Sequence, residues 1–318
     1  MKNNSVTKIG IVGVGTTGCS MSVLTTGHGY QTVGLIRRPN LIADYEKRFS
    51  NYFKAMNIEG IVSAEQGGIC AKYLTYTTDY NDLRDCEIIF ECVSENLETK
   101  HEVYAQIEKS CPKVRAICSV SSAIIPDQLA SSATKYKDRI IVTHPFKPAH
   151  IVPYFELCGG KDTDPAVITF AKEFLESLDR KPTVLKKPSP GFIGNRLQFA
   201  LWREALNLVE SGICDPEDVD TCLRYSFMPR YTAIGMFEHF DNGDLRLNIT
   251  TCNTVFPTLS NVTEAPAVLT DKVENDDTGV RAESMTGFYD WKAVDLVAFR
   301  KRALSQSWKF VNWEFPTE

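Results

Sequence analysis

The first half of the chain alternates short apolar runs with longer segments of helical periodicity. The apolar runs are bounded by glycine, proline or polar residues, as strands usually are. They predict strands at residues 8–14, 32–36, 74–77, 88–92, 116–119, 140–143 and 153–158, and the segments between them predict helices at residues 17–28, 43–56, 97–111, 126–136 and 165–178. Strands that alternate with helices indicate an α/β fold, a doubly wound parallel sheet covered by helices on both faces.

The pattern changes near residue 188. Two prolines and a glycine fall within the six residues 186–191, a composition that typically separates structural units. Helical periodicity dominates beyond this point, with Gly212 well placed to end the first long helix. We expect helices at residues 192–211, 216–225, 265–276 and 291–310. The sequence therefore predicts an α/β domain over residues 1–188 and an all-helical domain over residues 189–318.

The composition and net charge of the chain argue against several classes of protein. The chain has 318 residues, of which 43% are hydrophobic and 24% charged, which is typical of globular proteins. The net charge of −5 argues against a protein built mainly to hold nucleic acid. No run reaches the ~18 apolar residues of a membrane span, and the start of the chain has no apolar signal segment. We therefore expect a cytoplasmic protein that binds neither nucleic acid nor membranes.

The pattern of the ten cysteines bears on disulfides and metal binding. None of them falls in a C-x-x-C pair, and their spacing is irregular. Structural zinc sites and disulfide frameworks usually show closer order. We interpret the cysteines as free thiols in a reducing compartment and predict no metal site.

A G-x-G-x-x-G motif begins at Gly13, directly after the first expected strand and at the start of the next helix. In that context Gly13 permits a tight turn, Gly15 lets the backbone approach a pyrophosphate, and Gly18 allows close packing of helix and strand. Thr16 and Thr17 begin the helix, whose free N–H groups and partial positive charge attract phosphates. The motif predicts a Rossmann-type dinucleotide site; the alternative is a glycine-rich turn without a ligand.

The end of the second expected strand indicates which dinucleotide is bound. An acidic residue about 20 positions after the glycine motif would bind the ribose 2′-hydroxyl of NAD. Arg37 and Arg38 stand there instead. Guanidinium groups pair with a 2′-phosphate through the bidentate geometry that arginine favours. The sequence therefore favours NADP(H) over NAD(H), which stays possible if the two arginines are simply solvated.

Six later segments carry a family resemblance through their shared order. They are E-C-V-S-E-N-L-E-T-K at 91–100, S-V-S-S at 119–122, H-P-F-K-P at 144–148, Glu156 twelve residues after His144, P-G-F-I-G-N-R at 190–196, and T-G-F-Y at 286–289. Together they resemble the 3-hydroxyacyl-CoA dehydrogenase family, from about residue 8 to about residue 290. The resemblance implies a dehydrogenase that acts on a secondary alcohol, with a helical domain that forms a homodimer.

His144 is the residue type that such chemistry needs. Hydride transfer from a secondary alcohol leaves a proton to be removed, and an imidazole exchanges protons near neutral pH. The resemblance implies that His144 is the general acid/base and that Glu156 orients and polarises its ring, as in other His–acid pairs. We interpret the remaining histidines as structural or exposed: His28, His101, His150 and His239.

The resemblance also implies roles for four other residues. Ser122 and Asn195 would hydrogen-bond the substrate oxygen and hold the reacting groups. Glu95 and Lys100 would line the cofactor site near the nicotinamide ribose. Taken alone, Ser122 and Asn195 could instead be residues at helix starts.

Three departures from the family pattern bear on the substrate. Lys147 replaces an asparagine that usually touches the cofactor, and it could meet the cofactor phosphates, the substrate or Glu156. Glu283 and Ser284 stand where the family carries a lysine that meets coenzyme A. The segment M-P-R-Y-T-A-I-G at 228–235 resembles the branch that contains lambda-crystallin/L-gulonate 3-dehydrogenase and carnitine 3-dehydrogenase. Arg230 could clamp a free carboxylate there, or could simply stack in its loop.

These observations predict an NAD(P)-dependent oxidoreductase that interconverts a 3-hydroxy acid and a 3-oxo acid, with NADP(H) favoured. A small anionic substrate, the free acid, is favoured over a CoA thioester. The alternatives are a 3-hydroxyacyl-CoA dehydrogenase for short-chain thioesters, an enzyme that oxidises a heterocyclic or sugar alcohol, and a non-catalytic NADP-binding crystallin-like protein.

Overall fold

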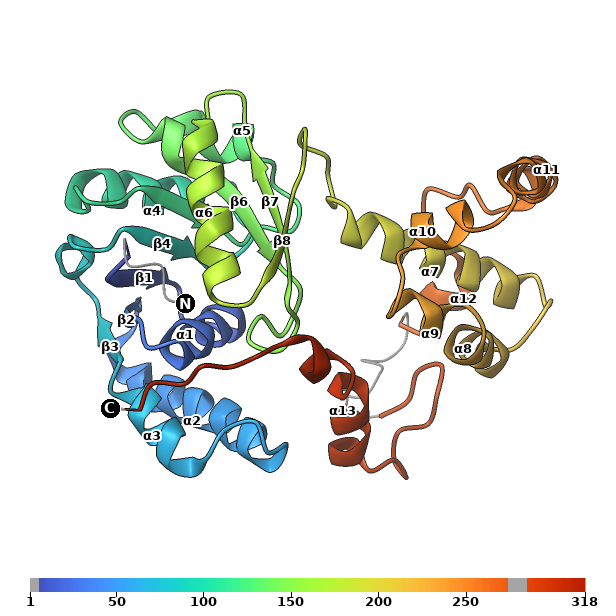
Figure 1. The fold of residues 1–318 in the computed structure, drawn as a ribbon, viewed down its shortest axis with the longest axis horizontal. Coiled ribbons are helices and arrows are strands. Elements are labelled where there is room, and N and C mark those ends of the chain that lie inside the picture. Colours follow the sequence, from blue (N-terminus) through green and yellow to red (C-terminus); the bar gives the residue numbers. More distant parts are fainter. Residues whose placement is uncertain (1–5, 274–284, 318) are drawn as a thin grey trace. The chain divides into compact units, whose positions relative to one another are not determined.

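The computed structural model describes residues 6–273 and 285–317, and it divides into two compact units (Figure 1). The first unit comprises Met1–Ile193 together with Lys301–Glu318, and the second comprises Gly194–Arg300. The first part of the chain therefore ends five residues later than the break expected at residue 188. The last residues return to the first unit, because Trp308, Trp313 and Phe315 pack against its apolar core.

The first unit is built on an eight-stranded sheet in the order β3-β2-β1-β4-β5-β6-β7-β8. Neighbouring strands are parallel except β6 and β7, which are antiparallel. The strands are β1 (Lys8–Val12), β2 (Gln31–Leu35), β3 (Leu74–Thr77), β4 (Ile88–Glu91), β5 (Ala116–Ser119), β6 (Ile140–Pro145), β7 (Tyr154–Gly159) and β8 (Lys181–Val184). The doubly wound α/β prediction is confirmed. Strand β8 was not expected, because Lys-Pro-Thr-Val is short and contains a proline, which suits only an edge strand.

Helices cover both faces of this sheet, as a buried parallel sheet requires. They are α1 (Thr16–Gly27), α2 (Ile42–Ile58), α3 (Ala64–Ala71), α4 (Leu97–Ser110), α5 (Pro126–Leu129) and α6 (Pro165–Ser177). One apolar cluster includes Met21, Leu24 and Phe174, and the other includes Tyr104 and Ile107. The helix expected at residues 126–136 is much shorter than predicted, since only α5 at its start is α-helical.

The second unit is all-helical. Its helices are α7 (Gly194–Glu210), α8 (Pro216–Tyr225), α9 (Met228–Tyr231), α10 (Met236–Asp241), α11 (Leu245–Val255) and α12 (Ala267–Thr270), and α13 (Leu296–Leu304) crosses from the second unit to the first. Helices α10 and α11 were not expected. In the part of the chain that the structure describes, no helix combines the length and apolar character needed to cross a membrane.

A C-terminal strap, which we define as residues 306–317, lies against the first unit. The Trp313 ring stacks parallel to the Phe315 ring, with their centroids 5.0 Å apart, and lies 4.9 Å from the ring of His28. The backbone N–H of Asn312 donates to the carboxylate of Asp179 at 2.6 Å. Trp313 also packs so closely over Gly27 that a Cβ there would lie 2.4 Å from the indole. The strap is therefore part of the first unit's fold.

Candidate active site

The glycine motif forms a tight turn between β1 and α1. Gly13 has φ +90°, and a Cβ on it would lie 3.0 Å from the backbone of Cys92, just after β4. A Cβ on Gly18 would lie 2.0 Å from the carbonyl oxygen of Gly13, so helix and strand touch at this point. By contrast, Gly15 faces open space and begins α1 without a side-chain cap. The turn can therefore admit a pyrophosphate to the N–H groups of the helix, as a Rossmann-type site requires.

The sheet topology places this turn where ligands bind in open α/β sheets. The strand order reverses between β1 and β4, and the crevice at the carboxyl ends of the strands on either side of such a reversal is the usual dinucleotide site. Arg37 and Arg38 follow the end of the adjacent strand β2, and both are exposed. No acidic side chain stands at either of the two positions.

His144 and Glu156 form a buried pair on β6 and β7. The two residues lie directly opposite each other in the antiparallel register, and His144 Nδ1 lies 2.9 Å from Glu156 Oε2. His144 is 6% exposed and Glu156 is fully buried. A carboxylate at this distance holds the proton on Nδ1 and leaves Nε2 free to accept one. The twelve positions from His144 to Glu156 thus span the end of β6, the connection that follows it and the start of β7, which runs back beside β6.

The segment that follows β8 closes around this pair. Gly191 and Phe192 both have left-handed backbones, with φ of 76° and 49°. This conformation is rare for a bulky residue such as phenylalanine, and backbone strain of this kind gathers at functional sites. The Phe192 ring lies 5.6 Å from the His144 ring, and the Ile193 N–H donates to Glu156 Oε1 at 2.8 Å. We did not assign either residue a role from the sequence, although P-G-F-I was part of the resemblance.

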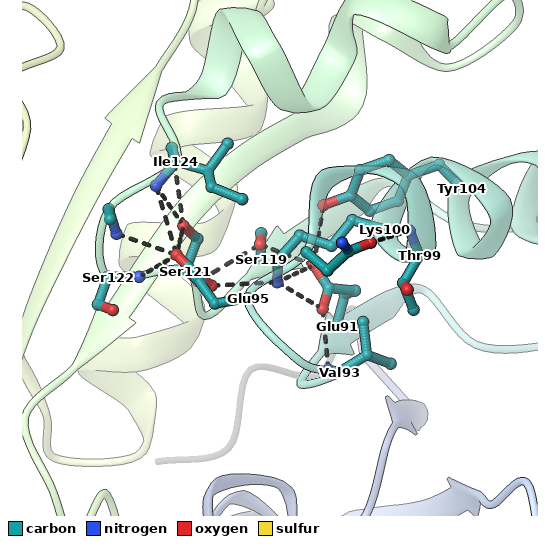
Figure 2. Close-up of polar contacts among 12 residues, drawn as sticks. Glu91, Val93, Glu95, Thr99, Lys100, Tyr104, Ser119, Ser121, Ser122 and Ile124 are labelled. Carbon is teal, nitrogen blue, oxygen red and sulfur yellow. Dashed lines mark hydrogen bonds and ion pairs between the residues drawn. The ribbon is translucent and has the colours of Figure 1, made fainter.

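Ser122 lies on a turn after β5 that is held by the carboxylate of Glu95 (Figure 2). Glu95 Oε1 accepts the Ser121 hydroxyl and the backbone N–H groups of Ser122, Ala123 and Ile124, at 3.1, 3.0 and 3.3 Å for the three N–H groups. Burial raises the pKa of Glu95, but these hydrogen bonds and the charge of Lys100 outweigh it and hold the pKa below its usual value. Glu95 is therefore a carboxylate that orders this turn.

Lys100 is fully buried, and its ammonium group contacts two carboxylates. Its Nζ lies 2.9 and 3.0 Å from the two oxygens of Glu91 and 3.6 Å from Glu95 Oε2. Glu91 also accepts the hydroxyls of Tyr104 and Ser119. Sequence reasoning missed Glu91, Tyr104 and Ser119, since only the second glutamate of E-C-V-S-E was assigned a role.

The remaining candidate residues lie elsewhere. Lys147 is exposed and follows β6, three residues after His144. Asn195 is the second residue of α7 in the second unit. Arg230 is exposed on α9 of that unit, with its Nη1 3.3 Å from His239 Nε2. Glu283 and Ser284 lie outside the described residues. The structure brings together the His144–Glu156 pair within the first unit and, separately, the Glu95–Lys100 network beneath the Ser122 turn.

The structure also locates the cysteines and the side chains that could bind a metal ion. All ten cysteines are free. Across residues 6–273 and 285–317, no group of three or more His, Cys, Asp or Glu side chains is arranged to hold a metal ion.

Comparison with known proteins decides the family. Residues 8–188 match the NAD binding domain of 3-hydroxyacyl-CoA dehydrogenase, and residues 191–291 match its C-terminal domain. The chain belongs to the 3-hydroxyacyl-CoA dehydrogenase family. This family member is an NAD(P)-dependent dehydrogenase that acts on a CH–OH group.

Three similar proteins define its relationships further. An L-carnitine dehydrogenase of Mesorhizobium japonicum is 40% identical over 154 residues, which are 48% of this chain and 42% of that protein. From the same organism, 5-formyl-3-hydroxy-2-methylpyridine 4-carboxylate 5-dehydrogenase is 28% identical over 94% of this chain and 96% of its own. A crystal structure of a dehydrogenase for that pyridine compound, described as an NAD⁺-dependent dismutase, matches with a TM-score of 0.84 and 26% identity over 96% of this chain and 97% of its own.

Proposed function

We propose that this dehydrogenase interconverts a free 3-hydroxy acid and the corresponding 3-oxo acid, with NADP(H) as its cofactor. The observation that carries the proposal is the buried His144–Glu156 pair in the same α/β unit as the glycine motif. Such a pair moves a hydroxyl proton, which is what hydride transfer at a secondary alcohol demands. A purely structural NADP-binding protein would have no need of a histidine held in this tautomer.

The residues present fit a bound nicotinamide dinucleotide. Gly15 leaves open space, and the uncapped start of α1 offers its N–H groups to the phosphates. The cofactor supplies the hydride chemistry, and this chain's side chains supply proton transfer and orientation. His144 Nε2 would take the hydroxyl proton in oxidation and return it in reduction, while Glu156 stabilises the imidazolium. Ser122 and Asn195 would hydrogen-bond the substrate oxygen, a role that rests on the family resemblance.

NADP(H) is favoured over NAD(H) because two exposed arginines, Arg37 and Arg38, follow β2 where an acid would bind a ribose hydroxyl. We expect NADPH to bind at least about tenfold more tightly than NADH, a difference of about 1.4 kcal/mol. Arg37→Asp should reverse this preference, because a carboxylate repels a 2′-phosphate and accepts a hydrogen bond from a 2′-hydroxyl. Titration followed by nicotinamide fluorescence measures both constants.

The control for this prediction is Arg84→Asp, the same change of charge at another exposed arginine. It should leave both constants within about twofold, because Arg84 does not follow β2 and an exposed charge is screened by salt. If Arg37→Asp leaves the ratio of NADPH to NADH affinity unchanged, the two arginines are solvated, and NAD(H) becomes the cofactor to test first.

The proposal of a free-acid substrate rests on Arg230 and on the relatives, one of which is named for a pyridine carboxylate. A guanidinium can clamp a carboxylate through two parallel hydrogen bonds. We expect Arg230→Ala to lower kcat/KM for free 3-oxo acids about 10–100-fold and to leave CoA thioesters unaffected, because only the free acid presents a carboxylate. Oxidation of NADPH by a panel of free acids and matching thioesters measures this.

Arg224→Ala, at an exposed arginine of the same unit, is the matched control and should change neither substrate class. Equal losses on acids and thioesters in Arg230→Ala would refute the clamp. Greater activity of the wild-type protein on short-chain thioesters than on free acids would favour the CoA-dependent alternative. Turnover in the panel that is the same for the wild type and for a His144 variant would favour a non-catalytic NADP-binding protein.

A second candidate substrate is a heterocyclic alcohol bearing a carboxylate. The similarity that supports it extends over nearly the whole chain, both in sequence and in fold, to the pyridine 4-carboxylate 5-dehydrogenase. The Arg230 clamp and the His144–Glu156 pair suit this substrate equally well, since it too combines a carboxylate with an alcohol. Including hydroxymethyl and formyl pyridine carboxylates in the panel separates the two.

We further propose a cytoplasmic homodimer joined through the helical unit, as the family resemblance implies. The second unit exposes large apolar side chains along α10 and α11, including Phe237 (90% exposed), Leu247 and Ile249. Several large exposed apolar side chains on two successive helices favour an interface with another protein. The free thiols agree with a reducing compartment.

A further inference from the structure

A buried ionic bridge joins the end of β4 to the turn that carries Ser122 (Figure 2). Lys100, on the first turn of α4, is fully buried, as is Glu91 at the last position of β4. The ammonium group contacts both oxygens of Glu91 at 2.9 and 3.0 Å and Glu95 Oε2 at 3.6 Å. One positive charge is therefore shared between two carboxylates.

The first of these carboxylates is fixed to the sheet. Glu91 lies opposite Ser119 in the parallel pairing of β4 and β5, and its Oε2 accepts the Ser119 hydroxyl at 2.7 Å and the Tyr104 hydroxyl at 2.9 Å. Its Oε1 accepts the backbone N–H of Val93 at 2.9 Å. With Lys100 included, Glu91 receives hydrogen bonds from one strand, one loop and one helix. These bonds hold the Glu91 carboxylate in one position at the end of β4.

The second carboxylate holds the turn. Glu95 directs Oε1 to the Ser121 hydroxyl and to three successive backbone N–H groups, those of residues 122–124, and directs Oε2 to Lys100. Without the ammonium group, Glu91 and Glu95 would face each other as like charges, one of them fully buried. An uncompensated buried charge is strongly unfavourable, so Glu95 would turn away and release the N–H groups.

We propose that Lys100 is a positioning residue, which acts through Glu95 to fix the turn of residues 121–124 and so the place of Ser122. This role is separate from any contact with the nicotinamide ribose, because it runs through two carboxylates of the protein itself, which the fully buried ammonium group contacts. The role of Ser122 in catalysis rests on the proposed function, whereas the ordering of the turn by Lys100 does not.

The test is a double-mutant cycle of Lys100→Met and Ser122→Ala, with kcat, KM and the NADPH Kd measured for each variant. A misplaced group can cost about 10²-fold, so Lys100→Met should lower kcat about 10–100-fold. Measuring kcat at saturating NADPH, with the NADPH Kd beside it, separates this loss of rate from any loss of cofactor affinity. The double variant should be no more than about twofold slower than Ser122→Ala, since effects that act through one group do not multiply.

Multiplying losses, or a rise in NADPH Kd that accounts for the loss of rate, would overturn the proposal. Glu95→Gln provides a second variant in case Lys100→Met does not fold. Its amide oxygen can still accept from the turn, but its NH₂ group faces the ammonium, so the link is cut without a surplus buried charge. For Glu95→Gln we expect the same pattern of kinetic results as for Lys100→Met, with a smaller loss of kcat. Lys109→Met, at an exposed site on the same helix, is the control.

Hydrogen–deuterium exchange of the peptide that spans residues 119–126 tests the order of the turn without any substrate. The N–H groups of Ser122, Ala123 and Ile124 should exchange at least about tenfold faster in Lys100→Met than in wild type, and faster by a smaller factor in Glu95→Gln, whose amide oxygen still accepts from the turn. Unchanged exchange in both variants refutes the proposal, whatever the activity. Faster exchange in a protein that reduces no substrate of the panel supports the positioning role and refutes the proposed function alone.

Discussion

His144→Gln is expected to lower kcat by about 10²–10⁴-fold, the usual contribution of a positioned acid or base. Glutamine fills similar space and can hydrogen-bond Glu156, but its amide cannot carry a proton between substrate and solvent. The hydride step then loses its base in oxidation and its acid in reduction. Steady-state rates of NADPH oxidation, with the NADPH Kd measured beside them, distinguish this loss from a loss of binding, because the Kd should stay unchanged.

The matched control is His101→Gln, because the His101 ring hydrogen-bonds the carbonyl of Gln128 and the hydroxyl of Ser131 instead of a carboxylate. It should keep full activity. A His144→Gln protein that is folded and retains more than about a tenth of wild-type kcat would show that another group carries the proton, and the assignment to the β6–β7 pair would be wrong.

Glu156→Gln is expected to have an effect nearly as large, about 10²–10⁴-fold on kcat, and for a different reason. The Ile193 N–H donates to Glu156 Oε1, so an amide at this position will turn its oxygen toward Ile193 and its NH₂ group toward His144. His144 Nδ1 must then accept, which moves the ring proton to Nε2. A histidine in that tautomer cannot act as a base, and the corresponding change in the Ser-His-Asp triad costs about 10⁴-fold.

Steady-state kinetics together with thermal unfolding test this second expectation. The NADPH Kd should be unchanged, and the unfolding midpoint should change little because the amide keeps one hydrogen bond on each side. Glu173→Gln, at an exposed site on α6, should change neither kinetics nor unfolding. If kcat of Glu156→Gln falls by less than about threefold while the protein remains folded, the carboxylate does not set the state of the histidine.

Much of the first unit could be predicted because its sheet is buried. Strands such as Ile88–Glu91 and Ile140–Pro145 are buried along their whole length, and each begins with three consecutive apolar residues. The His144–Glu156 pair could be anticipated only from family resemblance, since the cross-strand register that brings the two together cannot be read from spacing alone. Edge strand β8 and the short helices of the second unit carry too weak a pattern for such an analysis.

The Lys100 network shows where sequence reasoning ends. A lysine in an amphipathic helix normally lies in water, and nothing in the local pattern marks Lys100 as buried. Its burial depends on Glu91, Tyr104 and Ser119, which come from three different elements and meet only in the folded sheet. The same holds for Trp313, whose contacts with Gly27 and His28 join residues nearly 300 positions apart.

The return of the C-terminal strap to the first unit also determines how the chain joins the two units. The backbone passes between them at two peptide bonds, Ile193–Gly194 and Arg300–Lys301, instead of one. The first of these connections directly follows Phe192 and includes Ile193, whose N–H binds Glu156. The same short stretch of backbone therefore links the two units and holds the carboxylate of the proton-transfer pair.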